Sequence, residues 1–179
     1  MFNIKKISTM KKLFFSIMCM AAFATVGLMA GCDEEKSGNE SNGGNGPVEF
    51  VDLDLTSHTK WKSANENGFY DYESAMEKFG TSLPTKAQLQ ELKHECTWVW
   101  NSAKKGFDIE GSNGNSIFLP AAGYIDCVGD LRRVGELGFY WSSTIDHDDY
   151  AWDYYFVSDS VGIYSSSFCH NLSVRLVQN

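Results

Sequence analysis

The sequence predicts an α+β domain with a small, irregular antiparallel sheet, one or two helices and long loops. Three observations lead to this fold class. Residues 48–55 alternate apolar and acidic side chains with a period of two, which indicates a strand with one buried face. One strong helix start follows near residue 85. From residue 97 onward, aromatic and β-branched segments alternate with polar loops, which is typical of strands.

The first elements follow from local patterns. Alternation over 48–55 places Val51, Leu53 and Leu55 on one face, which we expect to be core. The mixed segment Tyr72 to Phe79 can form two helical turns, and Gly80 is suited to end them because glycine adopts C-terminal cap conformations easily.

The clearest helix start in the chain follows Leu-Pro at 83–84. Thr85 can cap the helix, and the side chain of Gln88, three residues later, can bond back to the backbone of Thr85. This is the pattern of a capping box. Leu89, Leu92 and Cys96 then share one face of the helix, which we expect to be buried.

The rest of the domain is predicted to consist of strands and turns, without an internal repeat or a coiled-coil heptad. A turn is expected at Ser112 to Asn115. The predicted strands are Thr97 to Trp100, Phe107 to Glu110, Ile117 to Leu119, Phe139 to Ser143, Ala151 to Val157, and Leu172 to Val177.

The chain of 179 residues carries a net charge of −8, and the charge is unevenly distributed. Four lysines and no acidic residue precede Cys32, so a protein beginning at Cys32 has 11 Lys and Arg against 23 Asp and Glu, a net charge of −12. Such a surface repels phosphates and anionic headgroups. We therefore expect no nucleic-acid partner and no electrostatic attachment to a membrane.

The N-terminal residues 1–31 are predicted to be a signal peptide. An apolar run from Leu13 to Ala30 follows two lysines, and residues 28–32, Leu-Met-Ala-Gly-Cys, resemble the cleavage site of bacterial lipoproteins. Cys32 would then carry the lipid, with fatty acids such as palmitate. An uncleaved transmembrane anchor is the alternative, because the run is long enough to span a bilayer. Translation can begin at Met1 or at Met10, because Met10 opens a compact signal peptide by itself.

The lipid would hold the protein in the outer membrane, facing the cell exterior. The acidic run Asp33 to Ser37 resembles the short export signal of Bacteroidetes surface lipoproteins, although a solvated linker start explains it as well. Residues 32–47 are mostly Ser, Gly, Asn and charge, which predicts a flexible tether. The globular domain is expected to span 48–179.

Five cysteines are present, two of them in or at the end of the leader. The other three, Cys96, Cys127 and Cys169, are far apart and show no C-x-x-C spacing, so zinc and thioredoxin-like sites are not expected. We favour three buried or half-buried thiols. One disulfide with one free thiol is the alternative, because an oxidising compartment permits it.

Six fragments of the domain, in order, resemble the Fibrobacter succinogenes major paralogous domain. They are Val51-Asp52-Leu53 with Lys60-Trp61; Leu83 to Lys86 with Leu89 and Leu92; Cys96-Thr97-Trp98; Asn113 to Tyr124; Gly138 to Thr144; and Ser173 to Val177. The resemblance covers nearly all of 48–179. It departs at 63–72, which lacks the family's Gly- and Ala-rich pattern, and at Leu172, where glycine is common. These departures concern loop geometry.

The resemblance implies a C-type-lectin-like fold, related to formylglycine-generating enzymes, on a Bacteroidetes lipoprotein. Those enzymes hold copper with two cysteines, but Cys169 has no partner cysteine a few residues away. The four histidines show no nucleophile or metal-ligand spacing. We therefore expect neither catalysis nor a cofactor.

The candidate ligand-binding residues are Asp146, Asp148, Asp149, Tyr150 and Trp152, in and beside a loop between two predicted strands. The three aspartates offer hard oxygen ligands and form a weak calcium candidate, but the spacing lacks the EF-hand glycine and distal Glu. A solvated surface turn is the alternative.

The strand that follows places Trp152, Tyr154 and Phe156 on one face, with Tyr155 and Asp153 on the other. One face should be core, and the other would suit sugars or a protein partner if it is exposed. Nearby, Asp159-Ser160-Val161 resembles the Bacteroidetes O-glycosylation acceptor, so Ser160 is a candidate glycosylation site.

The sequence therefore predicts a cell-surface lipoprotein that presents a non-catalytic lectin-like module for a glycan or protein ligand. The alternative is a structural or accessory component of a surface or fimbrial assembly, with no ligand of its own. The ligand and the oligomeric state are left open.

Overall fold

This computed structural model describes residues 49–179. The predicted signal peptide, the lipidation site Cys32 and the linker to residue 47 lie outside the described residues. The elements are β1 (Phe50–Asp52), β2 (Lys60–Lys62), α1 (Tyr72–Phe79), α2 (Lys86–Glu95), β3 (Thr97–Asn101), β4 (Gly106–Glu110), β5 (Ser116–Pro120), β6 (Tyr124–Ile125), β7 (Leu131–Arg132), β8 (Gly138–His147), β9 (Tyr150–Val157), β10 (Ser160–Ser167) and β11 (Val177–Gln178), with a short 3-10 turn at Gly80–Ser82 after α1.

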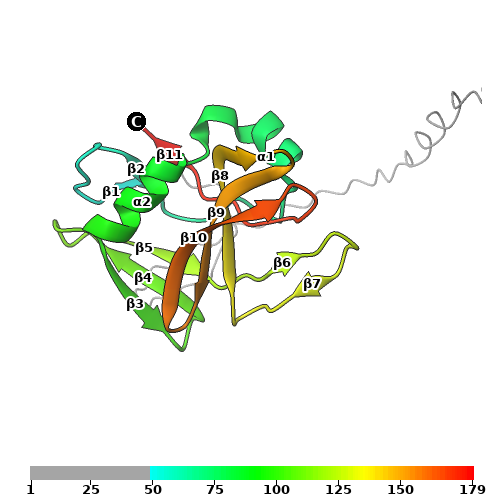
Figure 1. The fold of residues 1–179 in the computed structure, drawn as a ribbon. Coiled ribbons are helices and arrows are strands. Elements are labelled where there is room, and N and C mark those ends of the chain that lie inside the picture. Colours follow the sequence, from blue (N-terminus) through cyan, green and yellow to red (C-terminus); the bar gives the residue numbers. More distant parts are fainter. Residues whose placement is uncertain (1–48) are drawn as a thin grey trace, which may run out of the picture. The chain divides into compact units, whose positions relative to one another are not determined.

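The strands form several small antiparallel sheets rather than a single one (Figure 1). Three sheets have three strands each, in the orders β1-β2-β11, β3-β4-β5 and β10-β9-β8, and β6 pairs with β7 in a two-stranded ribbon. Figure 1 shows this ribbon extending from one side of the domain. The predicted α+β class with antiparallel strands and two helices is confirmed, but the single small sheet that the sequence predicts is divided into four separate sheets in the described part of the chain.

Both predicted helices form where their capping residues place them. Asp71 caps α1 by accepting a hydrogen bond from the Ser74 amide, and Gly80 ends the helix with a positive φ of 48°. In α2, Thr85 and Gln88 make the predicted capping box. These reciprocal bonds satisfy backbone donors that the first helical turn otherwise leaves unpaired.

The β8–β9–β10 sheet contributes to two hydrophobic cores. Tyr154 and Phe156 of β9 lie in the first core with Leu89 and Leu92 of α2. The second core contains Trp141 of β8 together with the following residues: Tyr72, Ala75, Leu83, Ala151, Leu172 and Val174. Since neighbouring residues of a strand face opposite sides, one sheet serves both cores.

Several strands differ from the prediction. The short strands β2, β6 and β7 were not predicted. β10 was not predicted either, yet it pairs with β9 along its whole length. The segment 172–177 was predicted as a strand, but only Val177 lies in one. Its backbone instead alternates between two neighbours: Leu172 bonds to Tyr70 and Ser173 bonds to Phe139 and Trp141. A segment wedged between two partners in this way cannot form a regular ladder with either.

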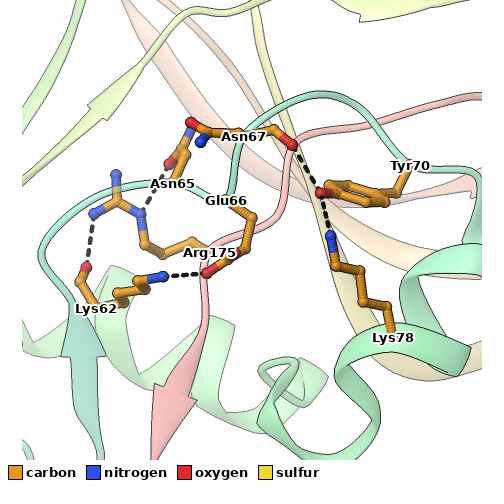
Figure 2. A network of polar contacts seen from close by, with 7 residues as sticks. All are labelled: Lys62, Asn65, Glu66, Asn67, Tyr70, Lys78 and Arg175. Atoms are coloured by element: carbon orange, nitrogen blue, oxygen red, sulfur yellow. Dashed lines mark hydrogen bonds and ion pairs between the residues drawn. The ribbon is translucent and has the colours of Figure 1, made fainter. Parts of the chain in front are cut away.

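Arg175 fastens this wedged segment to the surrounding chain. Its side chain is 2% exposed and donates to the Lys62 carbonyl (2.7 Å), Asn65 Oδ1 (2.8 Å) and the Phe118 carbonyl (2.6 Å). Figure 2 shows the first two bonds beside the Lys62–Glu66 ion pair. Burial lowers the pKa of Arg175 to about 10, so it remains charged at neutral pH.

Among residues 49–179, no helix is both long and apolar enough to cross a membrane.

Candidate functional site

Four of the five candidate ligand-binding residues lie at the turn of the β8–β9 hairpin. Asp146 belongs to the end of β8, Asp148 and Asp149 form the turn, and Tyr150 begins β9. All four are exposed. The Tyr150 ring stacks on His147 with centroids 4.9 Å apart, so the tip of the hairpin has some fixed shape.

Asp146 is exposed but also contacts neighbouring polar side chains. Its Oδ2 lies 2.7 Å from Nδ1 of His147. Desolvation raises the pKa of Asp146, but bonds from Ser165 and His147 outweigh it, and the pKa lies below its usual value. Asp146 is therefore ionised at neutral pH.

Trp152, the fifth candidate, makes a different contact. It is half-buried, and the ammonium group of Lys86 lies 3.1 Å from the centre of its ring. Lys86 is the first residue of α2, and its backbone amide donates to Thr144. The cation over the ring ties α2 to β9, so Trp152 has a structural partner already.

A hollow of about 480 Å³ lies next to the hairpin turn. Asp149 is the one residue that the sequence prediction and the hollow share. The lining comes from three segments: Asp71 and Glu73 at the start of α1, Asp149 of the hairpin turn, and Ser167, Phe168, Cys169 and Asn171 at the end of β10 and in the loop after it.

Stacking and a backbone bond hold the aromatic part of this lining in place. The Phe168 ring stacks on Tyr72, with centroids 4.2 Å apart and an interplanar angle of 20°. The Phe168 amide donates to the carbonyl of Asp149 at 2.8 Å. The hairpin turn and the loop after β10 are therefore joined directly.

A disulfide between Cys127 and Cys169 joins the loop after β10 to the β6–β7 ribbon. The Cα atoms of the two cysteines are 5.0 Å apart. The favoured prediction of three thiols is wrong, and Cys96 alone of the described cysteines is free. Cys169 has no partner cysteine nearby in the sequence, but folding brings Cys127 to it from 42 residues away. Desolvation, reinforced by Glu95 and Glu91, raises the pKa of Cys96 to about 11.

The hollow combines carboxylates, an amide, a hydroxyl and a phenyl ring. Such a mixture can accept hydrogen bonds from hydroxyl or amino groups while the ring contacts an apolar face. The Asp71 oxygens already accept bonds from Ser74, at 2.8 and 2.9 Å. Within 49–179, no group of three or more His, Cys, Asp or Glu side chains is arranged to hold a metal ion, and this includes Asp146, Asp148 and Asp149.

Sequence reasoning missed most of this lining because no local pattern marks it. Phe168 and Asn171 lie in a Ser-rich stretch without a motif, and Asp71 was not recognised as the cap of the predicted helix that follows it. The candidate glycosylation residue, Ser160, begins β10 and is exposed, away from the residues that line the hollow.

Comparison with known proteins supports a family assignment for this chain. No curated protein and no solved structure matches the chain. A family model described as a domain of unknown function, DUF8237, matches residues 84–177, which is just over half of the chain. The matched range contains α2, the strands β3 to β10 and both cysteines of the disulfide. The chain therefore belongs to the DUF8237 family.

Proposed function

We propose that this protein is a cell-surface lipoprotein whose globular domain is a non-catalytic, lectin-like binding module. The ligand, a glycan or a protein, occupies the hollow beside the β8–β9 hairpin. The single observation that carries this proposal is the lining of the hollow, in which hydrogen-bonding groups surround an aromatic ring on fixed segments.

The disulfide supports export. Disulfides form and persist in oxidising compartments outside the cytosol, and Cys127 and Cys169 are both exposed at the surface of the domain. This agrees with the predicted signal peptide and with the proposed lipid on Cys32, which would hold the protein in the outer membrane.

The resemblance to the Fibrobacter paralogous domain supports the lectin-like architecture rather than the ligand. Its most specific residues are structural: Trp141 is fully buried and donates to the Tyr70 carbonyl at 2.7 Å, and Arg175 is buried among carbonyls. Such residues fix the framework, while the hollow is lined by other segments.

Binding to the hollow can be tested with a glycan array and with pull-down of host matrix proteins. We expect Asp149→Asn and Asn171→Ala to weaken binding about tenfold, the effect of losing one hydrogen bond to a charged or buried group. Asp148→Asn is the matched control, because Asp148 is exposed in the same turn but does not line the hollow. Equal binding by all variants, or no binding by the wild type, would contradict the proposal.

The non-catalytic part of the proposal has its own test. Cys127 and Cys169 together could supply two thiolates after reduction. Copper bound in a one-to-one ratio to the purified protein, together with oxygen consumption, would contradict it.

A structural role in a surface assembly is the second candidate, and one observation favours it. The β6–β7 ribbon carries three exposed apolar side chains, Val128 (82%), Leu131 (54%) and Val134 (59%). Exposed apolar side chains that lie close together mark protein contacts. If Val128→Asp with Leu131→Asp dissolves a surface complex while ligand binding is unchanged, this role is favoured.

A further inference from the structure

A row of aromatic rings crosses the β8–β9–β10 sheet outside the hollow. Phe139 of β8 contacts Tyr155 of β9, and Tyr155 contacts Tyr164 of β10, with ring centroids 5.1 and 5.4 Å apart. On the other side Phe139 contacts Tyr124, which contacts His170, at 5.0 and 5.5 Å. None of these five rings is fully buried.

The cores do not account for the β9–β10 end of this row. Phe139 and Tyr124 pack against the second hydrophobic core, whereas Tyr155 and Tyr164 belong to neither core. Tyr164 is 56% exposed. Tyr155 and Tyr164 are thus two neighbouring aromatic rings outside the cores and open to solvent at least in part, and such a surface patch can contact a ligand.

The two tyrosines enclose a space of their own. Their rings meet at an interplanar angle of 81° and line a hollow of about 280 Å³. Because the rings are nearly perpendicular, they form a corner in which one ring offers its face and the other its edge.

Gly162 makes this corner possible. It lies directly opposite Tyr155 in the β9–β10 ladder. A Cβ atom at position 162 would overlap the Tyr164 ring. The ring therefore rests against the bare backbone of the glycine, and any side chain there would displace it.

We propose that the Tyr155–Tyr164 corner is a stacking subsite for a neutral pyranose sugar. The C–H face of a pyranose is apolar and slightly positive, so it is attracted to the negative face of an aromatic ring. The phenol groups can exchange hydrogen bonds with sugar hydroxyls. Among residues 49–179 no Lys or Arg lines the corner, and the acidic protein repels anionic ligands, so a neutral sugar fits better than a sulfated or phosphorylated one.

The aromatic row leads from the subsite toward the larger hollow. The aromatic row ends at His170, between Cys169 and Asn171, which line that hollow. An oligosaccharide bound in the hollow can therefore extend along the row to the corner. The inference rests on the proposed binding function and narrows its ligand to a glycan.

The test uses the full chain in detergent and calorimetric titration with three neutral hexasaccharides: cellohexaose, xylohexaose and mannohexaose. We expect at least one to bind, and Tyr164→Ala to weaken that binding about tenfold. Tyr164→Phe keeps the ring and should stay within about threefold of the wild type. Gly162→Ala removes no ring but displaces Tyr164, so this variant should also weaken binding about tenfold. Its thermal unfolding is recorded to show that the variant folds.

Val99→Ala is the control, since Val99 is 58% exposed on β3 and lines neither hollow. It should bind as the wild type does. If Asp149→Asn weakens hexasaccharide binding while Tyr164→Ala and Gly162→Ala do not, the subsite is refuted and the proposed function stands. If no hexasaccharide binds but a matrix protein does, the subsite is also refuted. If neither binds, both proposals fail.

Discussion

Asp153 is a carboxyl group placed where a charge is costly. It is fully buried on β9, opposite Trp141 of the second core, and among the described residues neither of its oxygens has a hydrogen-bond partner. Desolvation raises its pKa to about 7. Ser166 lowers the pKa in part, although its hydroxyl is not placed for a hydrogen bond to either oxygen.

The raised pKa predicts that Asp153 destabilises the fold as the pH rises. The unfolded pKa is near 3.8 and the folded pKa near 7, so the folded protein binds more protons in between. The contribution of Asp153 is therefore most favourable below pH 4 and declines until about pH 7, by about 4 kcal/mol at most. The stability contribution of groups with lowered pKa values changes with pH in the opposite direction, so a variant is needed to isolate the contribution of Asp153.

Asp153→Asn should remove this dependence because an amide does not ionise. We expect the variant to be more stable than the wild type at pH 8, by roughly 2–4 kcal/mol, and similar to it at pH 4. Urea unfolding at several pH values measures the difference. Asp159→Asn, in the exposed turn after β9, is the control. A difference between Asp153→Asn and wild type that is the same at pH 4 and pH 8 would count against the buried charge.

Arg175 is also a buried charged group, but unlike Asp153 it makes hydrogen bonds, through three of its nitrogens. Arg175→Met would leave the Lys62 and Phe118 carbonyls and the Asn65 side chain without these donors. We expect a loss of about 3–5 kcal/mol in the free energy of unfolding, because buried polar groups left unpaired are costly.

The matched control for Arg175 is Arg133→Met. Arg133 is exposed and pairs with Glu136 at 3.4 Å, so its removal should change stability by less than about 0.5 kcal/mol. Chemical unfolding of both variants measures the contrast. Similar losses in the two variants would show that Arg175 is not a fastening residue.

At the scale of elements, the sequence predicts those helices and strands that are determined by interactions between residues close together in the chain. The two helices follow from Asp71, Gly80, Thr85 and Gln88, each of which acts within four residues of its partner. β10 could not be predicted in the same way, because its serines and glycine have low strand propensity and its order comes from β9.

The candidate site shows the same division. The turn at Asp149 is recognisable from its acidic residues, but the hollow needs the start of α1 and the loop after β10 as well. Those segments meet because Phe168 stacks on Tyr72 and Cys169 bonds to Cys127. Spacing in the sequence carries no information about these long-range contacts.

The disulfide makes a testable contribution as a link between elements. It joins the β6–β7 ribbon to the loop after β10 across a separation of 42 residues. Closing a loop of this length in the unfolded chain corresponds to about 3–4 kcal/mol of stability. The double variant Cys127→Ser, Cys169→Ser should lose that amount, and reductant should then have no further effect on its urea midpoint.

Cys96→Ser is the control for the disulfide, because the Cys96 thiol is free. It should keep the sensitivity of the wild type to reductant. If reductant does not lower the stability of the wild type, the disulfide does not contribute as proposed.

At the scale of the whole molecule, charge limits how the domain can be kept at a membrane. From Cys32 onward there are 11 basic and 23 acidic residues. This excess of acidic residues is unfavourable for electrostatic attraction to an anionic membrane, so we propose that attachment depends on the N-terminal lipid. Each buried methylene of such a lipid contributes about 0.8 kcal/mol, so two or three chains anchor stably.

Cys32→Ala should therefore abolish labelling by a fatty-acid analogue and move the protein out of the membrane fraction. The wild type should remain in that fraction in 1 M salt, because high salt screens charges but does not weaken the burial of acyl chains. Cys96→Ser is the matched control and should be labelled normally. Cell fractionation and surface proteolysis measure both location and orientation. Persistent labelling of Cys32→Ala, or release of the wild type by salt alone, would refute the lipid anchor and with it the proposed display of the domain at the cell surface.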